Sequence, residues 1–341
     1  MNERYSRQQL FAPIGKDGQE KISKKHVLLI GAGALGTGNA EALVRAGIGK
    51  LTIIDRDYVE WSNLQRQQLY SEEDAKERLP KAIAAKQRLE QINSDVTVAA
   101  IVGDATAQEL ETIVKEQHPN LLIDATDNFE TRMIINDVSN KYRIPWIYGA
   151  CVGSYGISYA FVPGKTPCLH CLLETVPVGG LTCDTAGIIS PAVQMVVAYQ
   201  VAEALKILVE DWQSLRNKLV SFDLWKNQHV AIRVDQVKKD DCPSCGTHPT
   251  YPYLSYDMQT KTAVLCGRNS VQIRPAAKRE YDLRELAQLF SKQGLQVETN
   301  PYLVSVSLGE HRLVVFQDGR ALVHGTKDIQ EAKTLYYRYL G

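Results

Sequence analysis

Seven cysteines are the first residues whose type and spacing suggest a chemistry. Four of them form two Cys-x-x-Cys pairs, Cys168 with Cys171 and Cys242 with Cys245. Four thiolates complete a tetrahedral Zn²⁺ shell and leave no open position, so the pairs predict a structural zinc site. Each pair alone would also suit a redox motif. However, neither pair is expected between a strand and a helix, as in a thioredoxin-like motif.

A fifth cysteine, Cys183, lies in a glycine-rich segment just before a long predicted helix. A cysteine on a polar loop near a helix N-terminus can have a lowered pKa and act as a nucleophile. An ordinary half-buried thiol fits the pattern equally well, so both interpretations stay open. Cys151 and Cys266 are expected to be structural.

Three glycines with the spacing Gly-x-Gly-x-x-Gly lie where the apolar run 27–30 passes into the helix-forming segment 34–46. They are Gly31, Gly33 and Gly36. Such a turn lets the backbone and the helix N-terminus approach an anionic phosphate. Asp55 ends the next apolar run, where a carboxylate would bind ribose hydroxyls. The alternative is a tight turn with a solvated aspartate, but the combination favours a nucleotide site.

Polar and cationic side chains follow Asp55 and precede the next predicted helix. They are Ser62, Asn63, Gln65, Arg66 and Gln67, with Leu64 among them, and Lys81 at the start of that helix. Arginine binds phosphate oxygens bidentately and lysine binds them as a point charge. Asp127 and Asn128 follow the predicted strand 121–124, at the sheet edge where doubly wound folds bind ligands. A carboxylate beside a triphosphate is a natural Mg²⁺ ligand.

The elements that must position these residues alternate between strand and helix up to about residue 149. The strands are apolar throughout, which indicates burial on both faces and hence a parallel sheet. The sequence therefore predicts an α/β, doubly wound, Rossmann-like domain. Further strands should follow up to residue 163, then a long helix over about 191–210, and a strand at Val230–Val234 before the second cysteine pair.

The segment 246–252 has two prolines and no periodicity, so we expect a linker there. Beyond it, helices are predicted over 282–292 and 329–340, and strands over 303–306, 313–316 and 321–323. The predicted domains are thus 1–248 and a small α+β module, 249–341. Recruitment of a protein partner and simple stabilisation are equally suitable roles for that module.

The composition excludes several classes of protein. The 341 residues include 39 basic and 39 acidic ones, and a net charge of zero argues against bulk binding to nucleic acid or an anionic membrane. No apolar run approaches the ~20 residues of a membrane span. The first ten residues are too polar for a signal peptide. We therefore expect a cytoplasmic protein with neither nucleic-acid nor membrane partners.

The order of these motifs resembles that of ThiF/MoeB proteins, the bacterial relatives of ubiquitin-activating enzymes, over residues 1–248. The motifs are Arg4–Gln8, the glycine turn, Asp55–Asp57, Ser62–Gln67, Pro80-Lys81, Thr126–Asn128, both cysteine pairs, Thr182-Cys183 and Ala186-Gly187. The resemblance implies an adenylyltransferase. With ATP and Mg²⁺ it would adenylylate the C-terminal glycine of a ubiquitin-like sulfur-carrier protein, releasing pyrophosphate and preparing thiocarboxylate formation.

The resemblance also implies residue roles. Asp55 would hold the ribose, and Asn63, Arg66 and Lys81 the phosphates; Asp127 would bind Mg²⁺. Arg7 matches an arginine that reaches into the other subunit's active site, which implies a homodimer. The four paired cysteines match zinc ligands. Cys183 matches a cysteine implicated in sulfur transfer, and a sulfur-donor protein would be a further partner. Ala34 stands where the family usually has glycine in the turn.

Several functions remain in competition. The thiamine-thiazole pathway is favoured over the same reaction on the molybdopterin-synthase small subunit. A non-enzymatic zinc scaffold that binds ubiquitin-like proteins would release no pyrophosphate. A nicotinamide oxidoreductase would bind NAD and need no Mg²⁺. The sequence identifies neither the carrier nor the sulfur donor.

Overall fold

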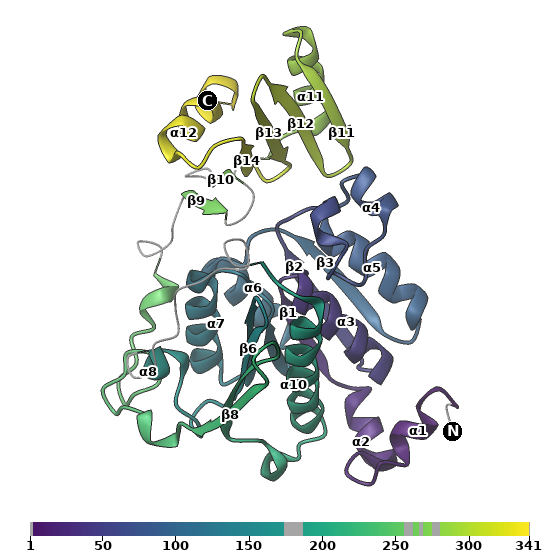
Figure 1. Cartoon of the computed structure of the whole chain (residues 1–341), viewed down its shortest axis with the longest axis vertical. Helices are drawn as coiled ribbons and strands as arrows, with labels where there is room; N and C mark the ends of the chain where they lie inside the picture. The colour runs from purple at the N-terminus through teal and green to yellow at the C-terminus, as the bar shows by residue number, and fades with distance from the viewer. Residues whose placement is uncertain (1–2, 174–186, 256–261, 266–268, 275–279, 341) are drawn as a thin grey trace. The chain divides into compact units, whose positions relative to one another are not determined.

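The computed structural model in Figure 1 describes residues 3–173, 187–255, 262–265, 269–274 and 280–340. The chain divides into two compact units, one holding the described residues up to 255 and the other those from 262 onward. Cys183 and Cys266 lie outside the described residues, so both of their predicted roles stay predictions.

The first unit is built on an eight-stranded sheet with the order β3-β2-β1-β4-β5-β6-β7-β8. Its strands are β1 His26–Ile30, β2 Lys50–Asp55, β3 Thr97–Val102, β4 Leu121–Asp124, β5 Trp146–Val152, β6 Tyr155–Phe161, β7 Lys218–Asp223 and β8 Gln228–Arg233. Strands β1 to β5 pair in parallel, and β5 to β8 pair antiparallel. This confirms the predicted Rossmann-like α/β fold.

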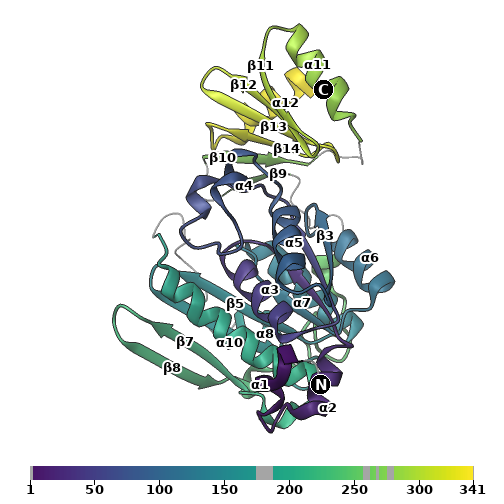
Figure 2. The ribbon, with the colours of Figure 1, turned by 90° about the vertical axis from the view of Figure 1, so that its right-hand side faces the viewer.

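Helices cover both faces of this sheet, because successive residues of a strand point to opposite faces. Val27 and Leu29 of β1 belong to one buried cluster, with α3 Ala34–Ala46, α5 Lys81–Ile92 and α10 Ser190–Leu208. Leu28 and Ile30 belong to the other, with α6 Ala107–Gln117 and α7 Phe129–Tyr142. Figure 2 shows α3, α5 and α10 together on one side of the sheet.

Short elements complete the first unit. They are η1 Glu3–Tyr5, α1 Ser6–Gln9, α2 Gly15–Ile22, η2 Trp61–Asn63, α4 Glu72–Lys76, α8 Leu169–Leu173, η3 Trp212–Ser214, η4 Asp235–Val237 and η5 Pro252–Leu254. Within the described part of the chain, no helix is both long and apolar enough to cross a membrane.

The second unit is an antiparallel sheet with the order β11-β12-β13-β14-β10-β9. Its elements are β9 Thr262–Leu265, β10 Ser270–Ile273, α11 Leu283–Lys292, β11 Gln296–Asn300, β12 Leu303–Leu308, β13 His311–Phe316, β14 Ala321–His324 and α12 Ile329–Leu340. Phe290 of α11 and Tyr336 of α12 join the apolar core on one face of the sheet. The α+β character is as predicted, with β9, β10 and β11 added.

The segment predicted as a linker is fastened to the first unit. The backbone N–H groups of Thr250 and Tyr251 donate to the carbonyl of Pro243, at 2.9 and 3.0 Å. The N–H of Tyr253 donates to Oδ2 of Asp137 on α7, at 3.0 Å. The prolines therefore interrupt helix and strand, but the segment stays hydrogen-bonded to the first unit. A functional division at residue 248 stays a prediction.

Candidate nucleotide and metal sites

The glycine turn between β1 and α3 contains two kinds of glycine. Gly31 has φ +97°, and a Cβ there would lie 2.5 Å from the carbonyl oxygen of Ala125. A Cβ on Gly36 would collide with the carbonyl of Gly31. Gly33 differs, because the nearest atom to a Cβ there would be Nε2 of Gln67, at 4.0 Å. Packing thus requires Gly31 and Gly36, whereas Gly33 leaves space in front of the N-terminus of α3, where an anion is favoured.

Asp55, at the end of β2, stabilises this turn by hydrogen bonding. Its Oδ2 accepts a hydrogen bond from the N–H of Ala32 at 2.6 Å, and its Oδ1 accepts one from the N–H of Asp57 at 2.7 Å. Burial raises the pKa of Asp55, and Lys81 opposes that rise. Since a carboxylate has about four lone-pair positions, Asp55 retains capacity for a ribose hydroxyl.

The predicted phosphate-binding cations come from two neighbouring segments. Lys81 begins α5, and its side chain, only 5% exposed, pairs with Asp57 at 3.3 Å. Arg66 is half-buried and donates to the carbonyl of Ser62 at 2.8 Å. The ion pair with Asp57 therefore holds the side chain of Lys81 in a buried position at the carboxyl edge of the sheet.

The other members of the 62–67 segment differ in exposure. Asn63 is buried, and its Oδ1 accepts from the N–H of Glu60 at 3.0 Å. Ser62 and Gln65 are exposed and Leu64 is half-buried. The side-chain oxygen of Asn63 is therefore engaged in a hydrogen bond at the start of η2. The predicted contact with phosphate would be made by its side-chain amide nitrogen.

Two more residues lie near the turn: Gln67, which ends the Ser62–Gln67 motif but was given no role of its own, and Tyr70, which was not selected from the sequence. Gln67 is 4% exposed, and its Oε1 has no hydrogen-bond partner among the described residues. The hydroxyl of Tyr70 donates to the carbonyl of Ala32 at 2.6 Å. A buried amide whose oxygen lacks a partner and whose nitrogen lies near the open side of Gly33 suits a polar ligand. The motif marks Gln67 in the sequence, but its burial depends on the fold.

The loop after β4 carries Asp127 and is held by a buried ion pair. Asp124 accepts from the N–H and hydroxyl of Thr126, at 2.9 and 2.7 Å, and from Nε of Arg132, at 3.0 Å. Arg132 also donates to the carbonyl of Thr126 at 2.7 Å. Burial raises the pKa of Asp124, and Arg132 opposes the rise. Asn128 caps α7, accepting from the N–H of Thr131 at 2.8 Å.

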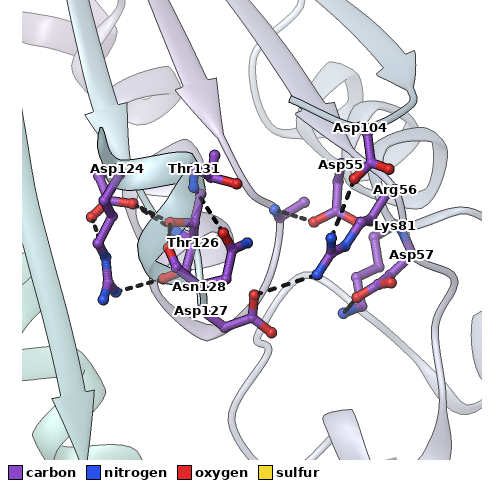
Figure 3. A network of polar contacts seen from close by, with 12 residues as sticks. Asp55, Arg56, Asp57, Lys81, Asp104, Asp124, Thr126, Asp127, Asn128 and Thr131 are labelled. Carbon is purple, nitrogen blue, oxygen red and sulfur yellow. Dashed lines mark hydrogen bonds and ion pairs between the residues drawn. The ribbon is translucent and has the colours of Figure 1, made fainter. Parts of the chain in front are cut away.

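Arg56 connects this loop to the end of β2, as Figure 3 shows. Its Nη1 lies 3.2 Å from Oδ1 of Asp104, and its Nη2 lies 3.8 Å from Oδ1 of Asp127. Burial lowers the pKa of Arg56, but Asp104, Asp57 and Asp127 together raise it above the ordinary value. Arg56 therefore stays charged, and no role was predicted for it from the sequence.

Arg7 lies away from the other predicted site residues of its own chain. The adjoining residues dock where α3 and α5 end, not where they begin: Gln8 donates to the carbonyl of Ala46 at 3.0 Å, and Arg4 donates to that of Ile92 at 2.8 Å. The side chain of Arg7 is exposed. The structure brings together Gly31, Gly33, Ala34, Gly36, Asp55, Lys81 and Asp127 on the carboxyl edge of one sheet, without Arg7.

The four paired cysteines converge on one point. Their Sγ atoms all lie within 4.8 Å of one another, with Cys168 3.6 Å from Cys242 and Cys171 3.6 Å from Cys245. Zn–S bonds of about 2.3 Å would place the sulfurs of a tetrahedral site about 3.8 Å apart. The set therefore fits a structural metal site, and no pair among these four is a disulfide.

Comparisons with known proteins agree with this geometry. A profile of the ThiF family matches residues 5–244. The chain is 55% identical over 341 residues to the sulfur carrier protein ThiS adenylyltransferase of Bacillus subtilis (strain 168), covering 100% of both chains. It is 35% identical over 244 residues to the protein of the same name from Escherichia coli (strain K12), covering 71% of this chain and 94% of that one. A crystal structure of E. coli MccB with ATP shares the fold, with a TM-score of 0.61, 23% identity, and coverage of 72% and 74%.

Proposed function

The chain belongs to the ThiF family, and we propose that it adenylylates the C-terminal glycine of a ubiquitin-like sulfur-carrier protein of the thiamine-thiazole pathway. The observation that carries this proposal is the similarity over the whole length to a ThiS adenylyltransferase. The open space at Gly33 supports it, because no neighbouring atom lies close enough to exclude a side chain there.

The proposed reaction depends on positioning and charge neutralisation. The ionised carboxylate of the carrier attacks the α-phosphorus of ATP, a new P–O bond forms, and the bond to the β-phosphate oxygen breaks to release pyrophosphate. Because the nucleophile is already ionised, fixed positive groups contribute more than a general base. Lys81 and Arg66 are the cations that we assign to the phosphates, with the backbone at Gly33 and Ala34.

Two metals belong to this proposal. Asp127 would hold Mg²⁺, which neutralises phosphate charge when bound; its carboxylate is 68% exposed and offers the hard oxygen ligands that Mg²⁺ prefers. Cys168, Cys171, Cys242 and Cys245 would hold Zn²⁺, which joins two segments far apart in sequence. We assign no step of the reaction to the zinc.

The remaining parts of the proposal concern partners. Arg7 is exposed and remote from its own glycine turn, which is compatible with a homodimer in which it completes the partner's site. Cys183 is assigned to sulfur transfer after adenylylation, together with a sulfur-donor protein. A reaction that consumes ATP is also consistent with a cytoplasmic enzyme.

ATP–pyrophosphate exchange tests the proposal directly. The purified protein is mixed with a thiamine-type carrier or with a molybdopterin-type carrier, and labelled pyrophosphate entering ATP is measured. We expect exchange with the thiamine-type carrier only. Exchange with the molybdopterin-type carrier alone would reassign the pathway. Tight carrier binding without exchange would make the protein a scaffold.

A further inference from the structure

The sheet edge that faces the proposed nucleotide carries more negative than positive side chains. Four carboxylates gather there, those of Asp55, Asp57, Asp104 and Asp127, with two cations, Arg56 and Lys81. Their formal charges sum to two negative charges (four carboxylates less two cations). ATP is itself an anion, so the way in which the two cations are shared among the carboxylates determines how much negative charge the ligand meets.

The ion pairs of Lys81 and Arg56 are made with different carboxylates, although Asp57 also lies close enough to Arg56 to interact with its charge. Lys81 faces Asp57 at 3.3 Å, whereas Arg56 faces Asp104 at 3.2 Å and Asp127 at 3.8 Å. Arg56 follows β2, Asp104 follows β3 and Asp127 follows β4, so one guanidinium joins the ends of three strands. Within the residues that the structure describes, the contact with Arg56 is the only ion pair found for Asp127.

The two contacts of Arg56 differ in strength. The side chain of Asp104 is 8% exposed and lies at hydrogen-bond distance, so this pair is fixed. The side chain of Asp127 is 68% exposed, and 3.8 Å is too long for a hydrogen bond. Asp127 is therefore held by charge alone, in contact with solvent, and another cation can replace the guanidinium without disturbing the buried pair.

We propose that Arg56 is a positioning residue that orients Asp127 while the metal is absent and competes with the divalent cation for its carboxylate. The inference rests on the proposed function, in which Asp127 holds Mg²⁺. Asp104 sets the strength of the competition, because it neutralises part of the guanidinium charge that Asp127 would otherwise experience. Residues 56 and 104 thereby tune the Mg²⁺ concentration at which the site fills.

The two residues should act in opposite directions. Arg56→Gln removes the competing charge, so the half-saturating divalent concentration should fall roughly fivefold. Asp104→Asn leaves the guanidinium less neutralised, so the same midpoint should rise by roughly that factor. Arg56→Lys keeps the charge and should stay within about twofold of the wild type. A residue that only stabilised the fold would shift both variants the same way, or would not move the midpoint.

The experiment uses Mn²⁺ as the probe. Free Mn²⁺ is followed by electron paramagnetic resonance as the full-length protein is titrated in the presence of a non-hydrolysable ATP analogue. Mg²⁺ dependence of ATP–pyrophosphate exchange is then measured on the same samples. Arg45→Gln is the matched control, because it removes an exposed arginine that pairs with Glu41, and it should change neither midpoint.

The double variant Arg56→Gln with Asp104→Asn guards against misfolding, since it leaves no buried carboxylate without its cation. Its Mn²⁺ midpoint should resemble that of Arg56→Gln. Equal midpoints in wild type, Arg56→Gln and Asp104→Asn would overturn the inference while leaving adenylylation intact. Loss of exchange in the wild type itself would instead remove the proposed function.

Discussion

Asp124 and Asp127 belong to the same loop, yet their surroundings are opposite. Asp124 is fully buried and is paired with Arg132, so its carboxylate holds the loop in its conformation. Asp127 is largely exposed and contributes little to packing. Their substitutions should therefore separate fold from function.

Asp127→Ala should leave the unfolding midpoint nearly unchanged, because exposed substitutions cost within about 0.5 kcal/mol. The same variant should lose roughly a hundredfold or more of its ATP–pyrophosphate exchange, since it removes the proposed metal ligand. Asp124→Ala is the comparison: it leaves Arg132 buried without its carboxylate and should cost about 3–5 kcal/mol of stability. Wild-type exchange in Asp127→Ala would remove this residue from the mechanism.

His26 makes stability depend on pH. The residue is 7% exposed, with Nδ1 3.0 Å from the carbonyl of Gln117 and Nε2 2.9 Å from Oγ1 of Thr52. Burial lowers the pKa of His26 below its ordinary value. As the pH falls, His26 is therefore protonated at a higher pH in the unfolded chain than in the folded protein. The contribution of His26 is fully present above about pH 6.5 and is lost progressively below it.

His26→Gln should remove this part of the acid sensitivity. Between about pH 7.5 and about pH 5.5, the urea midpoint of the wild type should fall by more than that of the variant. His118→Asn, at an exposed position, is the control and should follow the wild type. Parallel pH profiles for wild type and His26→Gln would contradict the assignment.

At the scale of elements, the turn from β1 into α3 has one glycine that packing requires and another that we assign to ligand binding. Gly36 is fixed by the carbonyl of Gly31 and would clash with any side chain, whereas Gly33 faces open space. The same motif thus contains a position that the fold requires and one that it tolerates.

Gly33→Ala should keep the unfolding midpoint of the wild type and raise the KM for ATP about tenfold, because a methyl group would enter the proposed phosphate position. Gly36→Ala should instead lose about 1–3 kcal/mol of stability through overpacking. Thermal unfolding and ATP-dependent exchange on both variants provide the check. An unchanged KM in Gly33→Ala would exclude the turn from phosphate binding.

The same elements explain how far the sequence could predict the structure. Strands β1, β2 and β4 and helix α3 were predicted because apolar runs and the glycine motif mark them locally. The link from Arg56 to Asp104 was not, because it requires β3 to lie beside β2, which no local pattern specifies. Strand β11 was also missed. It is a polar edge strand, defined by its pairing with β12 and not by an apolar pattern.

At the scale of the whole molecule, two relatives with the same printed name differ in length. The B. subtilis protein matches the entire chain, whereas the E. coli protein matches 71% of it and is itself covered over 94% of its length. A relative of the same name therefore has no counterpart to much of the remainder. This favours a first unit that performs the proposed chemistry by itself.

The position of a truncation should determine whether that unit survives. Asp137 is fully buried, and one of its oxygens accepts the N–H of Tyr253, whose side chain packs beside α7. A chain ending at residue 248 loses this donor and should be destabilised by about 1–3 kcal/mol. A chain ending at residue 255 keeps it, and should retain the wild-type unfolding midpoint and carrier-dependent exchange. Exchange lost at 255 would make the second unit part of the catalytic machinery, and weaker carrier binding at 255 with exchange retained would make it a recruitment module.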